Sequence, residues 1–204
     1  MTEVLKYIFI CVGGYLLGSV SISIILSRML GVDVRKKGSG NAGATNMARS
    51  FGLVAGFATL AGDFLKAVIV MYVGYRLCGD WGLMAGGVAC TTGHCFPIFY
   101  EFRGGKGISV GAAIGLAIDW RVFVGIVIVF LIAAFLSKKV SLGSLCAAVA
   151  VVVLSFVFAV PLPRLLLAIY AALLAIFQHR ANLKRLSEGT EPDFRAAAVN
   201  EKKD

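Results

Sequence analysis

Long apolar runs alternate with short polar stretches along this chain of 204 residues. A membrane-spanning helix needs about 20 predominantly apolar residues. The pattern predicts seven helical segments, at Val4–Leu26, Phe51–Leu77, Trp81–Phe99, Ile108–Ala117, Phe123–Leu136, Leu142–Val160 and Arg164–Gln178. The fourth and fifth are too short to span as straight helices and could form one re-entrant pair. We therefore expect an all-α integral membrane protein of about seven transmembrane helices, some of them short or re-entrant.

Composition supports the membrane assignment. Hydrophobic residues make up 59% of the chain and the mean hydropathy is +0.87, whereas soluble domains are roughly 45–50% apolar. A very apolar soluble helical domain is the disfavoured alternative. No internal repeat, linker or second domain is visible. We interpret residues 1–204 as a single polytopic membrane domain that ends in a polar cytoplasmic tail at 189–204.

The charged residues predict an orientation. The formal net charge is +9, and fifteen of the twenty Lys and Arg residues fall in segments that seven crossings place on one side, at 27–50, 100–107, 137–141 and 179–204. The other side carries four, at Lys6, Arg76, Arg121 and Arg164. Because cytoplasmic loops are enriched in Lys and Arg, this split predicts an N-out, C-in topology and an odd number of crossings.

One basic residue lies inside an apolar run. Lys66 follows Asp63 by three residues, so the two share a helix face and can form an ion pair. Charges at the bilayer centre face protein or water because exposing them to lipid is costly. The pair either locks this helix to its neighbours or contributes to a polar cavity.

The stretch GSGNAGATNMAR, residues 38–49, is small, polar and basic. Its G-x-G-x-x-G spacing lacks the βαβ context of a dinucleotide site, and Ala44 stands where a Walker A lysine would follow. Closely spaced glycines nevertheless let backbone N–H groups converge on an anion, and a following helix adds its positive end. A plain glycine turn would not need so many donors. We predict a phosphate-binding loop that includes Gly40, Asn41, Gly43, Ala44, Thr45, Asn46 and Arg49, with Ser39 as a further donor.

A second cluster is GHCFPIFYEFRGGKG, residues 93–107. Gly104, Gly105 and Gly107 surround Lys106, an arrangement of backbone and cation that suits phosphate, and His94 is a candidate catalytic group. The alternative is an aromatic belt at the membrane interface with an ordinary cytoplasmic lysine.

A third cluster, HRANLKRL at residues 179–186, follows the last apolar run. If the helix continues, His179 and Asn182 share one face with Leu183 and Leu186. A basic stop-transfer flank would explain the Arg and Lys residues but not the His and Asn on the inward face. Three donor-rich clusters on one side predict a substrate with more than one phosphate-like group, and the bilayer predicts a lipid-like chain. The cysteine spacings fit no metal or redox pattern, so we expect no metal, no cofactor and no nucleic-acid partner.

Together, the three clusters resemble the signature segments of the bacterial acyl-phosphate:glycerol-3-phosphate acyltransferases, the PlsY family. The similarity extends over essentially the whole chain and includes Gly189, Glu191, the VSLGS stretch at Val140–Ser144 and the Asp63–Lys66 pair. It implies a seven-helix enzyme of the bacterial inner membrane with its active site at the cytoplasmic face. The implied reaction moves a fatty acyl group from acyl phosphate to the 1-hydroxyl of glycerol 3-phosphate and gives lysophosphatidate and phosphate. It also implies functional coupling to the enzyme that forms acyl phosphate and to the next acyltransferase.

The resemblance suggests roles for individual residues. The catalytic candidates are Ser39, His94, His179 and Asn182, and the supporting candidates are Ser141, Arg185 and Glu191. We expect the loop at 39–46 with Lys106 to hold one phosphate, and Arg49 with the third cluster to hold the other. His179, His94 or the donor's own phosphate could take the hydroxyl proton. His94 shows no evident carboxylate partner in the sequence, and we expect Ser39 to orient a substrate without forming an acyl-enzyme. A transporter of a phosphorylated solute is the main rival class, and a membrane scaffold would not need such loops.

Overall fold

The computed structural model describes residues 2–193, and every regular element in that range is helical. The α-helices are α1 (Glu3–Ser19), α2 (Ile22–Met29), α3 (Ala44–Phe51), α4 (Leu53–Cys95), α5 (Ile108–Ile118), α6 (Trp120–Ser137), α7 (Val140–Val157), α8 (Leu162–Gln178) and α9 (Arg180–Ser187). Short 3₁₀ helices lie at η1 (Val34–Lys36) and η2 (Ile98–Tyr100). Residues 194–204, most of the predicted polar tail, lie outside the described residues.

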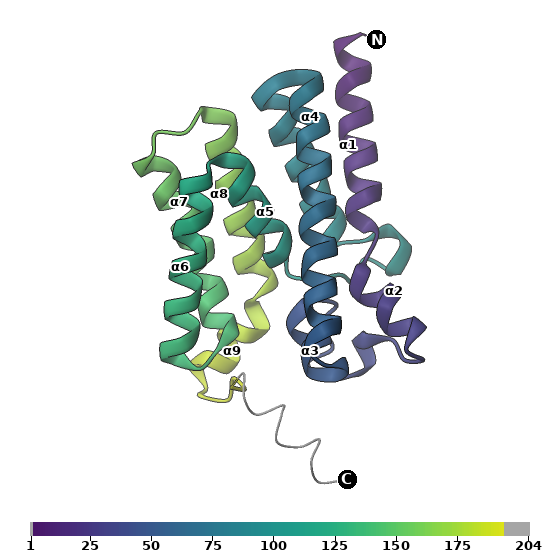
Figure 1. Ribbon diagram of the computed structural model, residues 1–204, viewed down its shortest axis with the longest axis vertical. Helices are drawn as coiled ribbons and strands as arrows, with labels where there is room; N and C mark the ends of the chain where they lie inside the picture. The colour runs from purple at the N-terminus through teal and green to yellow at the C-terminus, as the bar shows by residue number, and fades with distance from the viewer. Residues whose placement is uncertain (1, 194–204) are drawn as a thin grey trace.

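Helix α4 consists of two antiparallel arms. Its backbone leaves the helical conformation at Cys78 and at Gly79, which has a φ of +60°. Figure 1 shows the ribbon turning back on itself at this point, at the top of the molecule. The second and third predicted segments therefore exist as separate arms that are joined by a tight turn.

The boundaries of the other segments differ from the prediction. Helix α3 (Ala44–Phe51) lies mostly within the stretch 38–49, which was predicted to be a loop. The first apolar run is divided, because α1 ends at Ser19 and α2 begins at Ile22. The fifth segment was predicted to be too short, and this is wrong: α6 has 18 residues and is long and apolar enough to cross a membrane. Segment four is indeed short, since α5 has 11 residues. By length and composition, four helical stretches of residues 2–193 qualify as spans, with the two arms of α4 taken as one, or five if α8 and α9 are counted as one bent span.

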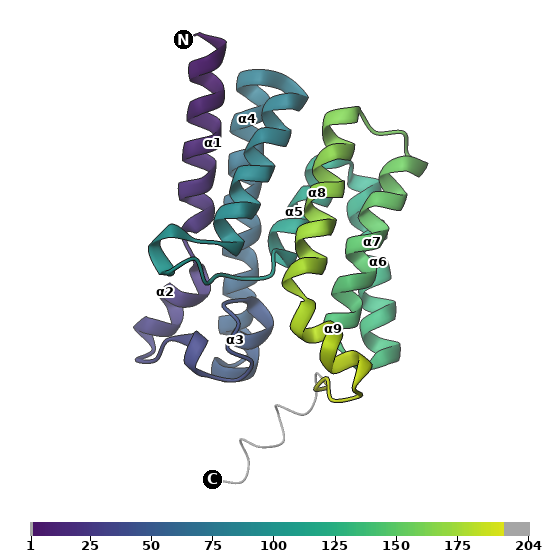
Figure 2. The ribbon, with the colours of Figure 1, turned by 180° about the vertical axis from the view of Figure 1, so that it is seen from behind.

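The helices form two packed groups. Helices α1 and α4 lie together with α2 and α3 below them, and α5, α6, α7 and α8 form the other group, as two opposite views show (Figures 1 and 2). The largest core cluster joins the groups, with residues such as Met71, Ile114 and Leu167 fully buried. Apolar side chains also cover the outer flanks, for example Phe135 and Leu173, as expected for surfaces in contact with lipid tails.

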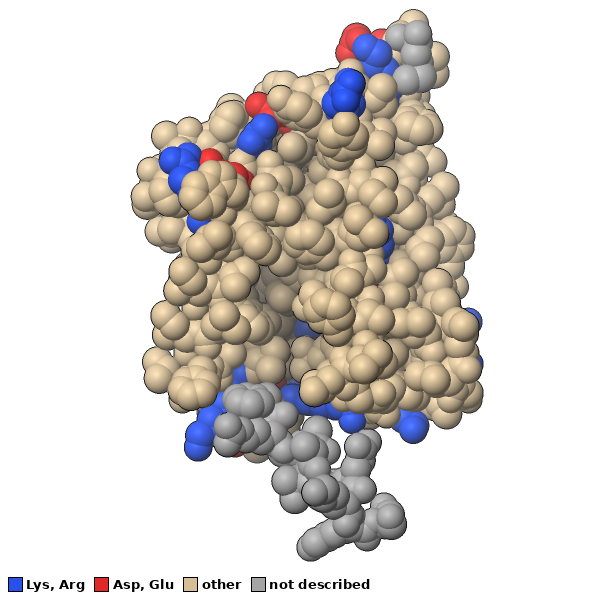
Figure 3. Space-filling model, viewed as in Figure 1, with Lys and Arg blue, Asp and Glu red and all other residues tan. Residues whose placement is uncertain are grey.

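The basic segments of the chain gather at one end of the bundle. The lower end in Figure 1 holds α2, α3, α9 and the turn between α6 and α7, whereas the N-terminus and the reversal of α4 lie at the upper end. Figure 3 shows Lys and Arg side chains around the lower end and tan, uncharged residues over most of the flank. The N-out, C-in orientation and the number of crossings remain predictions.

The buried ion pair explains how the break after α1 is stabilised. Lys66 Nζ lies 2.7 Å from Asp63 Oδ1 and donates to the carbonyls of Gly18 (2.9 Å) and Val20 (2.7 Å). These carbonyls belong to the end of α1, where no helical partner is available. Lys66 therefore joins α4 to the end of α1 at the break before α2.

Candidate active site

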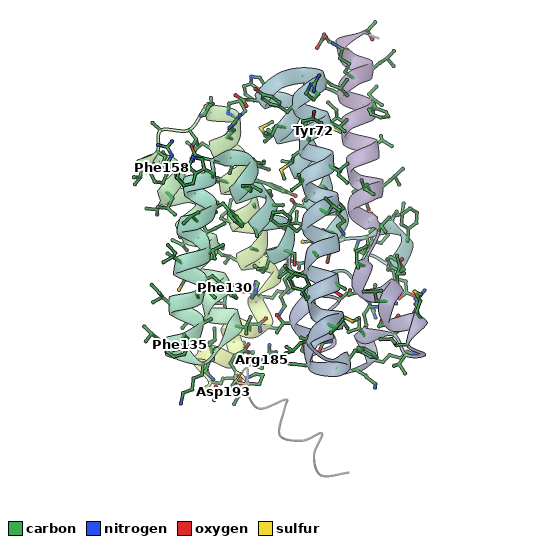
Figure 4. The ribbon with its side chains drawn as sticks, viewed as in Figure 1. Tyr72, Phe130, Phe135, Phe158, Arg185 and Asp193 are labelled. Atoms are coloured by element: carbon green, nitrogen blue, oxygen red, sulfur yellow. The ribbon has the colours of Figure 1, made fainter. Side chains whose placement is uncertain are left out.

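A polar cavity of about 530 Å³ lies among the basic loops. Side chains from all three predicted clusters line it, including Ser39, Arg49, His94, Lys106, His179, Asn182, Arg185 and Glu191. Figure 4 places Arg185 and Asp193, two lining residues, at the lower end of the bundle. The fold thus brings together residues that are more than 100 positions apart in the chain.

The loop before α3 is organised by the side chain of Asn46. Its amide nitrogen donates to the carbonyls of Val34 (3.1 Å), Lys37 (3.0 Å) and Asn41 (3.0 Å), and its oxygen accepts from the backbone N–H of Ser39 (3.0 Å). Gly38 has a φ of +55°, and a Cβ there would lie 2.2 Å from this oxygen. The side chain of Asn46 therefore shapes the loop, and it also lines the cavity. Its contact with phosphate stays a prediction.

Three helices begin at the cavity. The first residues of α3 (Ala44 and Thr45), of α5 (Ile108 and Ser109) and of α7 (Val140 and Ser141) all line it. The first N–H groups of a helix have no intrahelical acceptor and carry the positive end of its dipole. The sequence predicted this contribution only for the helix after the first cluster, which was expected to start at Phe51, whereas α3 already begins at Ala44. The convergence of three N-termini makes the cavity favourable for anions.

The second cluster folds against the end of α4. Gly104 N–H donates to the carbonyl of Cys95 (3.2 Å), and Gly105 N–H donates to that of His94 (3.1 Å). A Cβ on Gly105 would lie 2.2 Å from His94 Nε2, so only glycine fits there. Gly104 and Gly105 do not line the cavity, but these two backbone bonds hold the segment that precedes Lys106, which does line it.

Lys106 connects the second cluster to the third. Its Nζ donates to Asn182 Oδ1 at 2.5 Å. Burial lowers the pKa of Lys106 to about 8; the negative charge of Glu191 opposes this shift, and the positive charges of Arg185 and Arg49 add to it. The side chain of Lys106 therefore changes from its charged to its neutral form as the pH rises through about 8.

The third cluster forms its own helix. α9 is bent from α8 by 58°, so the helix does not continue straight as the sequence suggested. His179 and Asn182 are buried and face the cavity as predicted, but Leu183 is 41% exposed and does not share their face. His179 Nδ1 lies 2.7 Å from the carbonyl of Ala175. Because a carbonyl only accepts, Nδ1 carries the proton and Nε2 of the neutral ring is left as an acceptor.

Glu191 fixes the orientation of Asn182. Its Oε1 accepts from Asn182 Nδ2 (2.7 Å) and its Oε2 accepts from Arg185 Nε (2.7 Å), while Lys139 Nζ donates to its backbone carbonyl. Burial alone would raise the pKa of Glu191, but Ser141 and the donors of Asn182 and Arg185 hold that pKa below its ordinary value. The carboxylate is thus ionised, and the amide oxygen of Asn182 is turned toward Lys106.

The charges around the cavity are unequally matched. Asp63 is paired with Lys66, Asp193 with Lys139, and Glu191 with Arg185. Among residues 2–193, Arg49 and Lys106 are in no ion pair. The cavity therefore presents two cationic side chains with no anionic partner in the described protein.

Other predicted residues are distributed as follows. Asn41, Gly43 and Ser141 line the cavity, and Gly107 lines an adjacent groove, but Gly40 lines neither. His94 does have a carboxylate neighbour, contrary to expectation: its Nδ1 lies 3.6 Å from Asp63 Oδ1 and 3.2 Å from Lys66 Nζ. Ser109 and Ser144 also line the cavity, although neither was predicted as a site residue. Ser109 lies two residues beyond the second cluster, and Ser144 is the last residue of the VSLGS stretch. Their place at the starts of helices after polar loops is the signal that could have found them.

An apolar groove of about 450 Å³ continues from the cavity. The two spaces share the lining residues Leu60, Ile108, Ser109, Phe130 and Ser144. The rest of the groove is apolar and is lined by α4, α5, α6, α7 and α8. Figure 3 shows this face of the molecule hollowed above its basic lower end. A molecule with a charged head and a hydrocarbon tail would match both spaces at once.

These features define a polytopic helical membrane protein whose cationic cavity is continuous with an apolar groove. Comparison with known proteins makes the assignment specific. The chain belongs to the glycerol-3-phosphate acyltransferase family, whose sequence model matches residues 8–189.

Relatives in that family are similar over nearly their full length. The glycerol-3-phosphate acyltransferase of Symbiobacterium thermophilum is 38% identical over 187 residues, which cover 91% of this chain and 94% of that protein. The one from Rubrobacter xylanophilus is 39% identical over 185 residues, covering 89% and 92%. The crystal structure of PlsY (YgiH), an integral membrane glycerol 3-phosphate acyltransferase, in its glycerol 3-phosphate form matches with a TM-score of 0.90 and 34% identity, covering 95% of this chain and 98% of that one. Its lysophosphatidic acid form matches with a TM-score of 0.87 and 33% identity, covering 92% and 94%.

Proposed function

We propose that this protein transfers a fatty acyl group from acyl phosphate to the 1-hydroxyl of glycerol 3-phosphate, with lysophosphatidate and phosphate as products. The main support for the proposal is that the cationic cavity and the apolar groove are adjacent and share lining residues. Both substrates bear phosphate, and one also bears an alkyl chain. The family's activity and the glycerol 3-phosphate and lysophosphatidic acid forms of the PlsY structures support the acceptor and product.

The chemistry requires little beyond positioning and charge neutralisation. Acyl phosphate is a mixed anhydride, so phosphate is already a good leaving group. Arg49 and Lys106 supply charge-assisted hydrogen bonds, and the N-termini of α3, α5 and α7 add backbone donors. We infer that one phosphate binds by the loop at 39–45 and Lys106, and the other by Arg49 and the third cluster. Holding both reactants together can lower the barrier by several kcal/mol.

The attacking hydroxyl must lose a proton. His179 is placed to accept it, because its Nε2 carries a lone pair and its side chain lines the cavity. The phosphate of the donor is the alternative acceptor. The imidazole of His94 is a weaker candidate because its Nδ1 faces the buried pair Asp63–Lys66 and its Nε2 packs against Gly105. Ser39 acts as an orienting donor, and transfer proceeds without an acyl-enzyme.

We place the reaction at the cytoplasmic face of the bacterial inner membrane, in accordance with the distribution of basic loops. The donor would reach the site from an enzyme that forms acyl phosphate, and the product would pass to the next acyltransferase. A transporter would need a site near the bilayer midplane, whereas the cavity is lined by loops and helix starts at one end of the bundle.

The experiment is a product assay with the purified protein in detergent. Palmitoyl phosphate and glycerol 3-phosphate are supplied, and lysophosphatidate is measured by mass spectrometry. Palmitoyl-CoA replaces palmitoyl phosphate in a parallel reaction. The proposal expects product with the phosphate donor and none with the thioester. Product from the thioester alone would refute the acyl-phosphate dependence, and no product from either donor would refute the function.

A further inference from the structure

The apolar groove has a defined far end. Phe64 of α4 and Phe123 of α6 meet there, with ring centroids 6.1 Å apart and planes at 60°. Leu60 and Phe130, which the groove shares with the polar cavity, lie one turn before Phe64 on α4 and about two turns after Phe123 on α6. The two rings therefore reach across from opposite walls at the end away from the charged groups.

Small residues create the space in front of this pair. Gly111, Ala112, Ala148, Ala171 and Ala172 line the groove, and they come from α5, α7 and α8. Their short side chains leave room between the walls, whereas the two phenyl rings fill it. The small residues thus form the part of the groove that lies in front of the two rings.

The length of the groove can be estimated from helix geometry. Phe123 and Phe130 are seven residues apart on α6, which corresponds to a rise of about 10 Å. An extended chain advances roughly 3.6 Å for every three bonds, so this distance accommodates about eight methylene groups. A medium-length acyl chain would end before the pair, and a longer chain would meet it.

We propose that Phe64 and Phe123 form the end wall of the acyl-binding groove and determine which acyl-chain length the enzyme uses best. The inference rests on the proposed acyl-transfer function. The donor arrives from a lipid phase, so moving a methylene group from lipid into the groove gains little hydrophobic free energy. Discrimination must then come from fit, because forcing extra methylene groups against a filled wall costs packing energy.

The test compares decanoyl phosphate with palmitoyl phosphate at equal mole fractions in detergent micelles, with glycerol 3-phosphate saturating. The readout is the ratio of kcat/KM for palmitoyl to that for decanoyl phosphate. Phe123→Ala removes one of the two rings of the wall. We expect the palmitoyl-to-decanoyl ratio of kcat/KM to rise about fivefold or more, because the free energy that corresponds to a fivefold change is at the lower end of the cost of overpacking. Phe135→Ala is the matched control, since Phe135 lies on the same helix but is 72% exposed on the outer surface (Figure 4). Its ratio should equal that of the parent protein.

A second variant shifts the wall in the opposite direction. Val127 lines the groove one turn from Phe123, on the side of the polar cavity. Val127→Phe should shorten the usable groove and lower the ratio of kcat/KM for decanoyl to that for hexanoyl phosphate by a similar factor. Unchanged ratios in both variants, with the parent enzyme active, would overturn the end wall and leave the proposed function intact. A parent enzyme that uses no acyl phosphate would overturn the function itself.

Discussion

Lys106 and Asn182 are joined by a hydrogen bond from Nζ to Oδ1, although 76 positions separate them in the chain. The contact links the glycine-rich loop before α5 to the short helix α9. Glu191 sets the direction of the Asn182 amide, so the lysine meets an oxygen and not an NH₂ group. Hydrogen bonds thus connect Glu191, Asn182 and Lys106 in series, and they determine where the ammonium group of Lys106 lies in the cavity.

The charge of Lys106 should control the pH dependence of the reaction. Burial lowers its pKa to about 8, so the ammonium form that binds phosphate is present below this pH and is lost above it. We expect kcat/KM for glycerol 3-phosphate to fall as pH rises through about 8, because kcat/KM reports the free enzyme. Lys106→Arg should remove this alkaline limb, since arginine stays protonated. If kcat/KM of the arginine variant still fell at the same pH, the group that titrates there would not be Lys106.

Arg49 should act as a phosphate ligand. It lines the cavity and is in no ion pair with residues 2–193. A hydrogen bond to a charged group contributes about 1.5–3 kcal/mol, so Arg49→Ala should lower kcat/KM by roughly tenfold or more. Lys37→Ala, an exposed residue of the same loop region, serves as the control. Normal kinetics in a folded Arg49→Ala protein would exclude the arginine from the site.

Glu191 should be required for stability as well as for alignment. Replacement by alanine removes the acceptor for Asn182 and Arg185, and a charged hydrogen bond contributes about 1.5–3 kcal/mol. For a chain of this size we expect the Tm in detergent to fall by roughly 3–10 °C. Glu188→Ala is the matched control, because Glu188 is exposed and its contact with Lys184 is 3.9 Å long. Equal Tm values for the two variants would show that the hydrogen bonds of Glu191 to Asn182 and Arg185 do not stabilise the fold.

The sequence alone was enough to predict the helical membrane fold, because that fold depends on local patterns. The three polar clusters seen in the sequence all contribute side chains to the cavity. Apolar runs mark helices, and glycine with polar donors marks loops that bind anions. The bend at His179 and the break before Ile22 were not predictable in this way, because both involve contacts between distant parts of the chain. Lys66 donates to the carbonyls at the break, and Asn182, just beyond the bend, is bonded to Lys106 and Glu191. The carboxylate beside His94 was missed for the same reason: Asp63 lies 31 positions earlier in the chain, and only the fold brings the two together.

The topology can be tested by cysteine labelling in intact cells. In a protein without its native cysteines, Trp81→Cys and Lys37→Cys place thiols at exposed positions near opposite ends of the bundle. The N-out, C-in orientation predicts that a membrane-impermeant maleimide labels position 81 from outside and reaches position 37 only after lysis. The reverse pattern would place the cavity on the periplasmic side.

The central claim is that both substrates occupy the cavity and groove together and that the acyl group passes directly between them. Initial rates measured while both palmitoyl phosphate and glycerol 3-phosphate are varied test this claim most directly. Direct transfer requires a complex of the enzyme with both substrates, so the account predicts intersecting double-reciprocal plots. Parallel plots, which indicate a ping-pong reaction through an acyl-enzyme, would contradict it.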